Sequence, residues 1–217
     1  SKASPSLLEK DPQNRLLARG PRFRLSGELI RDHMLQASGK LSGKMYGPGV
    51  YPPQPLTVLA HAFGNKSWNA SKGEDRYRRS IYTFIKRTAP FAGFMTFDGT
   101  SGENCLAKRD RSNTPLQALT LLNDEMYLEL ARSAGEEVHQ SKDDPIHSLF
   151  RRFLTRPPKQ SETDALRAYY EQQIQRLEKG EIKPSEITAT PKATPELAGK
   201  VLLARAIMNL DEAITKP

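Results

Sequence analysis

The chain has 217 residues, which fits one large domain or one domain with an extended arm, and no run approaches the roughly 20 apolar residues that cross a bilayer. Its formal net charge of +8 is uneven, with +10 on residues 1–111 and −2 on residues 112–217, so we expect an anionic partner: nucleic acid, an anionic polysaccharide or an acidic neighbouring domain. The single cysteine, Cys105, excludes an intrachain disulfide, a multi-cysteine zinc site and a c-type haem attached to this chain.

Two helices are predicted in the first forty residues. Asp11-Pro12 is typical of an N-cap followed by the first helical position, and Gly20-Pro21 of a stop, which predicts a short helix between them. A second helix is predicted to begin at Ser26. Its apolar residues recur at helical spacing and form one face: Ile30, Met34, Ala37 and Leu41.

Residues 42–75 are predicted to be irregular, because proline and glycine recur there and forbid regular helix, with room for one turn of helix at residues 56–63. Two short strands are predicted next. Residues 80–85 are rich in β-branched and aromatic side chains, and residues 94–97 are the candidate to pair with them.

The rest of the chain is predicted to be helical. Thr114-Pro115 with Gln117 matches a capping box, and a helix follows that would bend or restart at residues 123–124. We expect its buried stripe to consist of Leu116, Leu119, Leu122, Met126 and Leu130. Further helices are predicted from Asp144-Pro145 to about residue 156, over residues 162–179, and from Thr194-Pro195 onward. Between the last two, residues 180–194 are predicted to be a mobile loop.

These elements predict a mainly α fold: one helical domain over residues 1–217, with a small two-stranded β element and long irregular segments rich in proline and glycine. The basic residues gather near one predicted helix start. A polar loop at residues 98–105 leads into Lys108 and its neighbours and then into the capped helix, which would bring cations and free backbone N–H groups together. The candidate anion-binding residues are Arg76, Arg78, Arg79, Arg87, Lys108, Arg109, Arg111, Asn113 and Thr114.

Plainer interpretations of the same residues stay open. The cations could form a solvated basic surface, and some arginines could pair internally with Asp75, Asp98 or Asp110. Asn113 and Thr114 are most simply helix-capping residues.

Catalytic candidates are few. Asp98 and Glu103 are two carboxylates in one loop, a pattern that could serve general acid–base chemistry on a glycoside but is common in loops. Cys105 lies near several cations that would favour its thiolate, although a buried structural thiol is the expected role. The four histidines show no ligand spacing, so neither a metal site nor any cofactor is predicted in this chain.

Three blocks of the sequence carry a family resemblance. They are residues 11–25, DPQNRLLARGPRFRL; residues 78–90, RRSIYTFIKRTAP; and residues 95–124, which include MTFD and RDRSNTPLQALTLLND. Together they resemble the C-terminal domain of unknown function of large secreted planctomycete proteins that also contain a cytochrome c domain. Where many relatives have Asp-Pro, this chain has Asp124-Glu125, so the proline that would enforce a helix restart is missing.

The resemblance implies an extracytoplasmic location, a haem only in an upstream domain, and a genetic association with polysaccharide degradation. It assigns no catalytic residue. We therefore predict a secreted, non-haem accessory module whose basic face binds the upstream domains of the same polypeptide, an acidic partner protein, or a sulfated or acidic polysaccharide. A carbohydrate-active enzyme built on Asp98 and Glu103 is the first alternative, and a nucleic-acid-binding module, disfavoured by the expected location, is the second.

Overall fold

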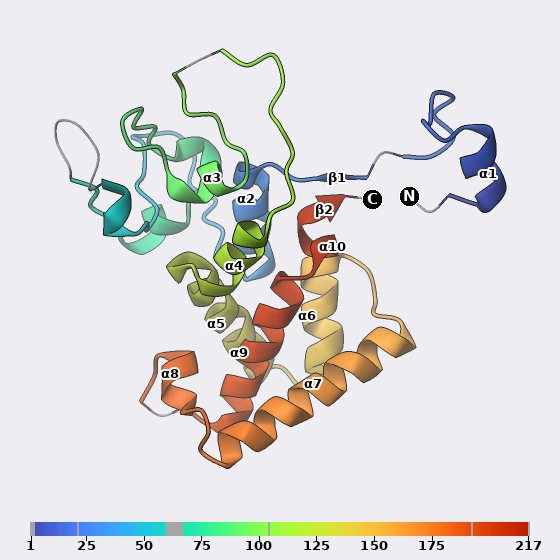
Figure 1. Ribbon diagram of the computed structural model, residues 1–217. Helices are drawn as coiled ribbons and strands as arrows, with labels where there is room; N and C mark the ends of the chain where they lie inside the picture. Colours follow the sequence, from blue (N-terminus) through green and yellow to red (C-terminus); the bar gives the residue numbers. More distant parts are fainter. Residues whose placement is uncertain (1–2, 21, 60–66, 104, 192, 217) are drawn as a thin grey trace.

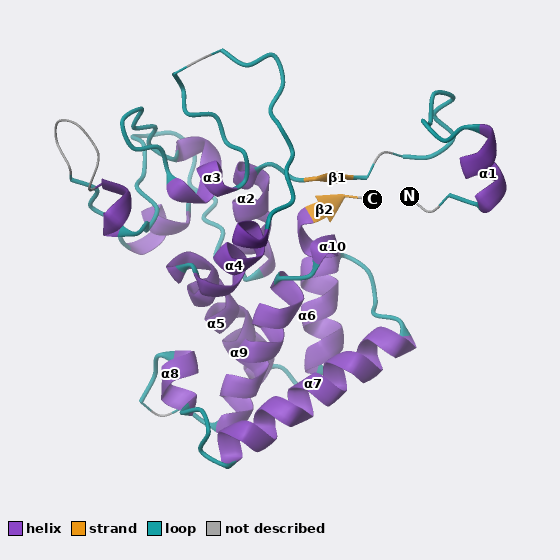
Figure 2. Ribbon diagram, viewed as in Figure 1, coloured by secondary structure: helices purple, strands orange, loops and turns teal. Residues whose placement is uncertain are grey.

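Helices α5 (Glu125–Gln140) and α9 (Pro195–Met208) lie side by side at the centre of the computed structural model, which describes residues 3–20, 22–59, 67–103, 105–191 and 193–216 (Figure 1). The mainly α prediction is confirmed, and Figure 2 shows the long helices in the lower part of the view and the longest loops above them. The other helices within the described ranges are α1 (Pro5–Lys10), α2 (Gly27–Ala37), α3 (Ala92–Thr96), α4 (Pro115–Asn123), α6 (Pro145–Leu154), α7 (Gln160–Glu178), α8 (Pro184–Thr188) and α10 (Asp211–Ile214).

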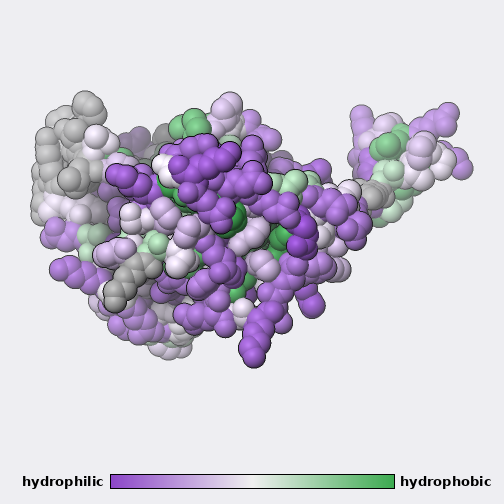
Figure 3. Space-filling model, turned by 90° about the horizontal axis from the view of Figure 1, so that it is seen from below, coloured by the Kyte–Doolittle hydropathy of each residue, from purple (hydrophilic) through white to green (hydrophobic). Residues whose placement is uncertain are grey.

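The hydrophobic core lies around helix α9. Helices α5, α6, α7 and α8 all contact it, so α9 is buried nearly all round and is built from small and aliphatic residues. Helix α5 buries one stripe against it, at Leu130, Ala131, Ala134 and Val138. Helix α7 lies outside this core and buries few of its residues, and Figure 3 shows that the molecule seen from below is predominantly hydrophilic. No helix among the described residues is both long and apolar enough to cross a bilayer.

The N-cap residues recognised in the sequence mark the starts of α4, α5, α6 and α9. Asp124, Asp144 and Thr194 each accept a hydrogen bond from a backbone N–H of the first turn that follows, and Thr114 with Gln117 forms the predicted capping box. The helix does restart at Asp124, whose carboxylate supplies the cap without the proline. This break divides the predicted buried stripe. Met126 and Leu130 on α5 are buried as predicted and Leu122 is half-buried, but Leu116 and Leu119 are exposed, and α4 buries Gln117 and Leu121 instead.

Two N-terminal predictions have different outcomes. Helix α2 begins after Ser26 and buries Ile30, Met34 and Ala37, as predicted. The helix predicted after Asp11 is wrong, because the Asp11 carboxylate accepts the backbone N–H groups of Arg15 and Leu16 at 2.8 Å and closes a loop. The helix lies one turn earlier, at α1, which is capped by Ser4 at the far end of an extended arm (Figure 1).

The predicted two-stranded β element is present, but the residues predicted to form its strands do not form them. Residues 80–85 begin with the 3₁₀ helix η3 (Ser80–Tyr82), and residues 94–97 fall mostly within α3. The sheet instead pairs β1 (Phe23–Arg24), which follows the N-terminal arm, with β2 (Thr215–Lys216) near the C-terminus, in antiparallel orientation. Ile81 is 79% exposed, so the β-branched side chains of this segment have no sheet face to pack on.

The proline- and glycine-rich segment is irregular where it is described. Within the described part of residues 42–75, the helical elements are the 3₁₀ turn η1 (Leu56–Leu59) and the start of η2 (Gly73–Tyr77). The turn η1 matches the first half of the turn predicted at residues 56–63. Residues 60–66 lie outside the described part, so the second half is not tested. Part of the loop predicted at residues 180–194 is helical, because α8 packs against α9.

Arg156 joins three elements around the N-terminus of α7. Its guanidinium donates to Glu162 at 2.7 Å and to Glu212 at 2.6 Å. The hydrogen bond from Arg156 lowers the pKa of Glu162 from 4.5 to about 2. A carboxyl whose pKa falls on folding stabilises the fold above its unfolded pKa, and that contribution is lost as the pH drops toward the folded value.

We therefore expect the free energy of unfolding to fall between pH 4.5 and about 2, and to fall less in the Glu162→Gln variant. At pH 7 the variant should be less stable by about 1 kcal/mol, since the cluster is partly exposed. Urea unfolding at each pH measures this, with Glu178→Gln on the same helix as control. If the free energy of unfolding fell equally with pH in wild type and in Glu162→Gln, the loss of stability in acid would not come from Glu162.

Candidate functional site

A buried arginine of α2 holds the loops of the candidate site in place. Arg31 is 1% exposed and donates to the carbonyl oxygens of Arg78 at 2.7 Å and Arg76 at 3.1 Å. Burial lowers its pKa to about 10 despite the neighbouring Asp32. Asp32 accepts the backbone N–H of Ser80 at 2.7 Å, so two consecutive side chains of α2 fix residues 76–80 against the helix.

A second arginine connects these loops to the segment before them. Arg78 is buried, donates to the carbonyl oxygens of Tyr46 and Pro48, and lies 3.8 Å from the centre of the Tyr82 ring. Val50 then exchanges backbone hydrogen bonds of 2.8 Å with Tyr82 and Phe84. The extended chain at residues 50–51 therefore lies beside residues 82–84.

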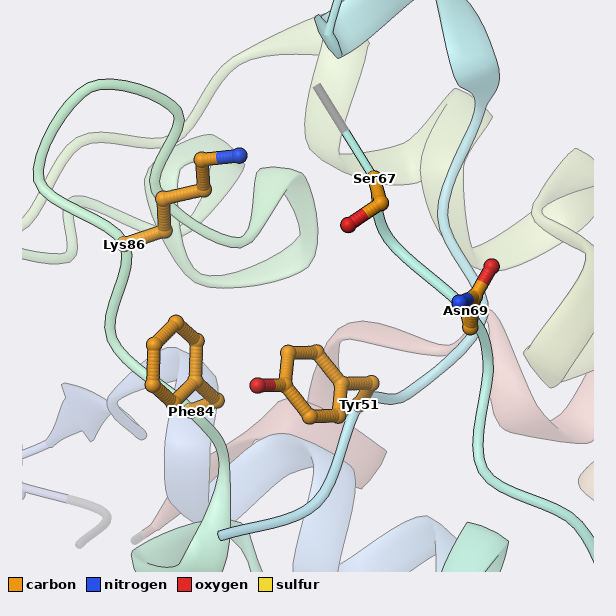
Figure 4. A pocket seen from close by; sticks show the side chains of 5 residues that line it. All are labelled: Tyr51, Ser67, Asn69, Phe84 and Lys86. Carbon is orange, nitrogen blue, oxygen red and sulfur yellow. The ribbon is translucent and has the colours of Figure 1, made fainter. Parts of the chain in front are cut away.

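These contacts shape a hollow of about 410 Å³, which we call the aromatic pocket. Tyr51, Ser67, Asn69, Phe84 and Lys86 line it, and Figure 4 shows the Lys86 ammonium and the Ser67 hydroxyl facing each other across it, above the two rings. The rings of Tyr51 and Phe84 have centroids 4.9 Å apart at an angle of 31°. They form one shallow apolar floor.

The floor is supported from below. Trp68 is buried with its ring edge-on to Tyr51, at a centroid distance of 5.2 Å, and its indole N–H donates to the carbonyl oxygen of Pro52 at 2.7 Å. The buried Trp68 ring, with its N–H satisfied, therefore packs against Tyr51 from the core side of the pocket.

A second hollow, of about 440 Å³, adjoins the first and shares Phe84 with it. We call it the Arg79–Arg109 groove. Its walls come from α2, η3, the loop at residues 83–90, α3 and the loop at residues 99–109. Exposed apolar side chains cover much of it: Leu29, Ile81, Phe84, Ile85 and Met95.

The predicted anion-binding residues do not form one surface. Arg76 pairs with Glu125 at 2.8 Å and Glu129 at 2.9 Å on α5, and Arg78 is buried as described. Arg109 donates to both carboxylate oxygens of Glu28, so it borders the groove.

The remaining members of the predicted set are spread over the neighbouring loops. The Arg111 guanidinium lies over the Phe23 ring, and the side chains of Arg87 and Lys108 are exposed. Thr114 serves the α4 capping box, and Asn113 beside it is exposed. Arg79 alone of the nine lies with Arg109 at the groove.

The catalytic candidates do not meet in a hollow. The Asp98 carboxylate accepts hydrogen bonds from Arg24 and from the backbone N–H and hydroxyl of Ser112, both at 2.8 Å, which occupies it within the fold. Glu103 is exposed, and so is Cys105, which makes the expected burial of the thiol wrong. None of the three lines the aromatic pocket or the groove.

Sequence reasoning missed the aromatic pocket. Lys86 lies outside the predicted anion-binding set, and Tyr51 lies in the segment at residues 42–75, for which only irregular structure is predicted. The available signal was the alternation of Tyr82, Phe84 and Lys86, which puts rings and a cation close together along the chain. Among the described residues no cluster of histidine, cysteine, aspartate or glutamate could hold a metal ion.

Comparison with known proteins gives one match. A family model described as PSD1, protein of unknown function (DUF1553), matches residues 1–170, which is most of the chain and includes both hollows. No curated protein and no solved structure matches it.

Proposed function

We propose that this chain, which belongs to the DUF1553 family, is an extracytoplasmic accessory module that binds an anionic polysaccharide and carries no cofactor of its own. In this proposal any haem belongs to another domain of the same polypeptide. The observation that carries it is the composition of the aromatic pocket: two rings, a cation and two small polar side chains around one hollow of about 410 Å³.

Each part of the pocket suits an acidic sugar. The C–H face of a sugar ring packs on aromatic faces, which Tyr51 and Phe84 supply. A sulfate or carboxylate accepts charge-assisted hydrogen bonds, which the Lys86 ammonium supplies. Asn69 and Ser67 offer an amide and a hydroxyl to the sugar hydroxyls. Volumes of roughly 300–1,000 Å³ are usual for small-ligand sites, so the hollow fits one or two sugar units.

The surrounding charge supports the same ligand class. Arg87 follows Lys86 in the chain and its side chain is exposed, and residues 1–111 together carry a net charge of +10. A positive field of this kind draws a polyanion toward the surface and weakens as salt is added. The pocket would then select where along the polyanion the chain binds.

The test is retention on immobilised dextran sulfate, compared with neutral dextran. We expect Lys86→Gln to weaken binding to dextran sulfate about tenfold, the size of one charge-assisted hydrogen bond. Tyr51→Ala should weaken it as well, because the floor of the pocket is lost. Lys142→Gln, an exposed lysine between α5 and α6, is the matched control for loss of one charge.

Three results would count against the proposal. If Lys86→Gln and Lys142→Gln bound equally, the attraction would be general and the pocket would have no role. If a DNA duplex bound more tightly than dextran sulfate at the same salt, the nucleic-acid alternative would be favoured. If an acidic upstream domain bound and dextran sulfate did not, the partner would be a protein.

A further inference from the structure

The Arg79–Arg109 groove has chemistry that a polysaccharide would not use. We propose that it binds a small amphipathic carboxylic acid, with the carboxylate held by Arg79 and Thr83 and the apolar body lying against the exposed aliphatic side chains. This site is separate from the aromatic pocket except for the shared Phe84, and the proposal does not depend on the polysaccharide.

The apolar wall is drawn from four different elements. Leu29 belongs to α2, Ile81 to η3, Ile85 to the loop that follows, and Met95 to α3, and all four are exposed although they line one hollow. Apolar side chains that converge on a concavity of about 440 Å³ are typical of ligand sites, whereas single exposed aliphatic residues are ordinary.

The groove contains two arginines, Arg79 and Arg109, and two carboxylates, Glu28 and Asp32, which differ in how far they are paired. Both Glu28 oxygens accept from Arg109, at 2.8 and 2.9 Å, and Asp32 accepts the Ser80 N–H. The Nε of Arg79 is 3.9 Å from Asp32, beyond hydrogen-bond distance, and its side chain is 54% exposed. Within the described part of the chain the Arg79 guanidinium has no hydrogen-bond acceptor. Because its one ion pair, with Asp32, is long, the Arg79 guanidinium is the group of this groove that can bind an anion.

A second, independent observation concerns Thr83, which follows Arg79 by four residues and belongs to the same wall of the groove. Thr83 is 6% exposed and lines the groove, yet its Oγ1 has no hydrogen-bond partner among the described residues. Buried hydroxyl groups are nearly always paired, because an unpaired one loses its bonds to water without replacement. The Oγ1 is closed to water in this structure, so in our proposal a carboxylate bound at Arg79 displaces part of the wall to reach Thr83, and both donors are then satisfied.

The charge and size of the site define the ligand class. One guanidinium and one hydroxyl suit a single carboxylate, and the short apolar wall suits a compact hydrocarbon or aromatic body. Octanoate is a suitable probe, and 1-octanol is its matched neutral counterpart, since both have the same chain length.

Isothermal titration calorimetry of the full chain with each probe tests the proposal. We expect octanoate to bind at least tenfold more tightly than 1-octanol. Arg79→Gln should weaken octanoate binding about tenfold and leave 1-octanol unchanged. Arg167→Gln is the matched control, because Arg167 is similarly exposed, at 51%, and lies beside an aspartate on a distant helix.

The Thr83→Val variant distinguishes a loss of octanoate binding from a loss of stability. It keeps the side-chain shape and removes an unpaired buried hydroxyl, so the chain should be no less stable, while octanoate binding falls several-fold. The proposal is overturned if octanoate does not bind, if both probes bind equally, or if Arg79→Gln has no more effect than Arg167→Gln. Binding of dextran sulfate that persists in saturating octanoate would leave the polysaccharide proposal standing whatever the outcome here.

Discussion

Replacing Arg31 by leucine should lower the free energy of unfolding by about 3–5 kcal/mol, the cost of breaking a buried charged network. Leucine fills much of the same space but donates nothing. The carbonyl oxygens of Arg76 and Arg78 and the Ser80 hydroxyl would lose their donor inside the protein, where each unpaired group costs about 1–3 kcal/mol. Since domains are stable by roughly 5–15 kcal/mol, this is a large fraction of the total.

The same substitution should abolish both proposed binding activities. Arg31 fixes residues 76–80, and the segment that begins there carries Arg79 and Thr83 into the groove and Phe84 into both hollows. Urea unfolding measures the stability, and octanoate and dextran sulfate titrations measure the sites.

Two other arginine variants provide comparisons for the loss of stability in Arg31→Leu. Arg31→Lys should have an intermediate effect, because one ammonium can reach only part of the set of acceptors. Arg22→Ala removes an exposed partner of Asp211 and should cost no more than about 1 kcal/mol. A loss below about 1 kcal/mol for Arg31→Leu would mean that water replaces the guanidinium, so that it does not hold the loops in place.

The helices that could be predicted from the sequence are those whose ends carry a local signal. Asp144-Pro145 and Thr194-Pro195 cap their own first turns, so the starts of α6 and α9 depend only on neighbouring residues. Asp11-Pro12 is the same dipeptide as Asp144-Pro145, but the Asp11 carboxylate accepts the backbone N–H groups of the residues four and five positions later, and this closes a loop.

The candidate site could not be predicted because its parts come from distant segments. Arg31 occupies a helix position where an arginine is usually solvated, and only the fold shows that residues 76–80 cover it. Tyr51 and Asn69 reach the aromatic pocket from the irregular segment, which has no periodicity to interpret. The strand prediction at residues 80–85 failed for a related reason: among the described residues Val50 pairs with Thr83 in an isolated bridge that does not extend into a sheet.

Gly135→Ala should destabilise the chain by about 3 kcal/mol, although alanine favours helix by about 1 kcal/mol over glycine. An added Cβ on α5 would lie 2.9 Å from both the Cα and the N of Val201 on α9, and 2.7 Å from its Cγ2. Two of these atoms belong to backbone, so the two central helices would have to move apart. Thermal or urea unfolding of the variant measures the loss.

A second glycine provides the matched comparison, because it differs in what its Cβ would meet. At Gly199 on α9 the closest atom is the Cδ1 of Ile174, at 2.5 Å, and a ring carbon of Tyr170 lies at 3.0 Å; both belong to half-buried side chains and not to backbone. Gly199→Ala should therefore change stability by less than about 1 kcal/mol, since a rotamer change relieves the contact and helix propensity offsets the rest.

The double variant Gly135→Ala with Val201→Ala tests the cause. It removes the Cγ2 contact but leaves the two backbone contacts at 2.9 Å, so most of the destabilisation should remain. Full recovery would show that the side chain of Val201, not the approach of the helix backbones, limits the space at this crossing. Equal losses at Gly135 and Gly199 would show that the α5–α9 contact is no tighter than the α7–α9 contact, and the core would then not be centred on α5 and α9.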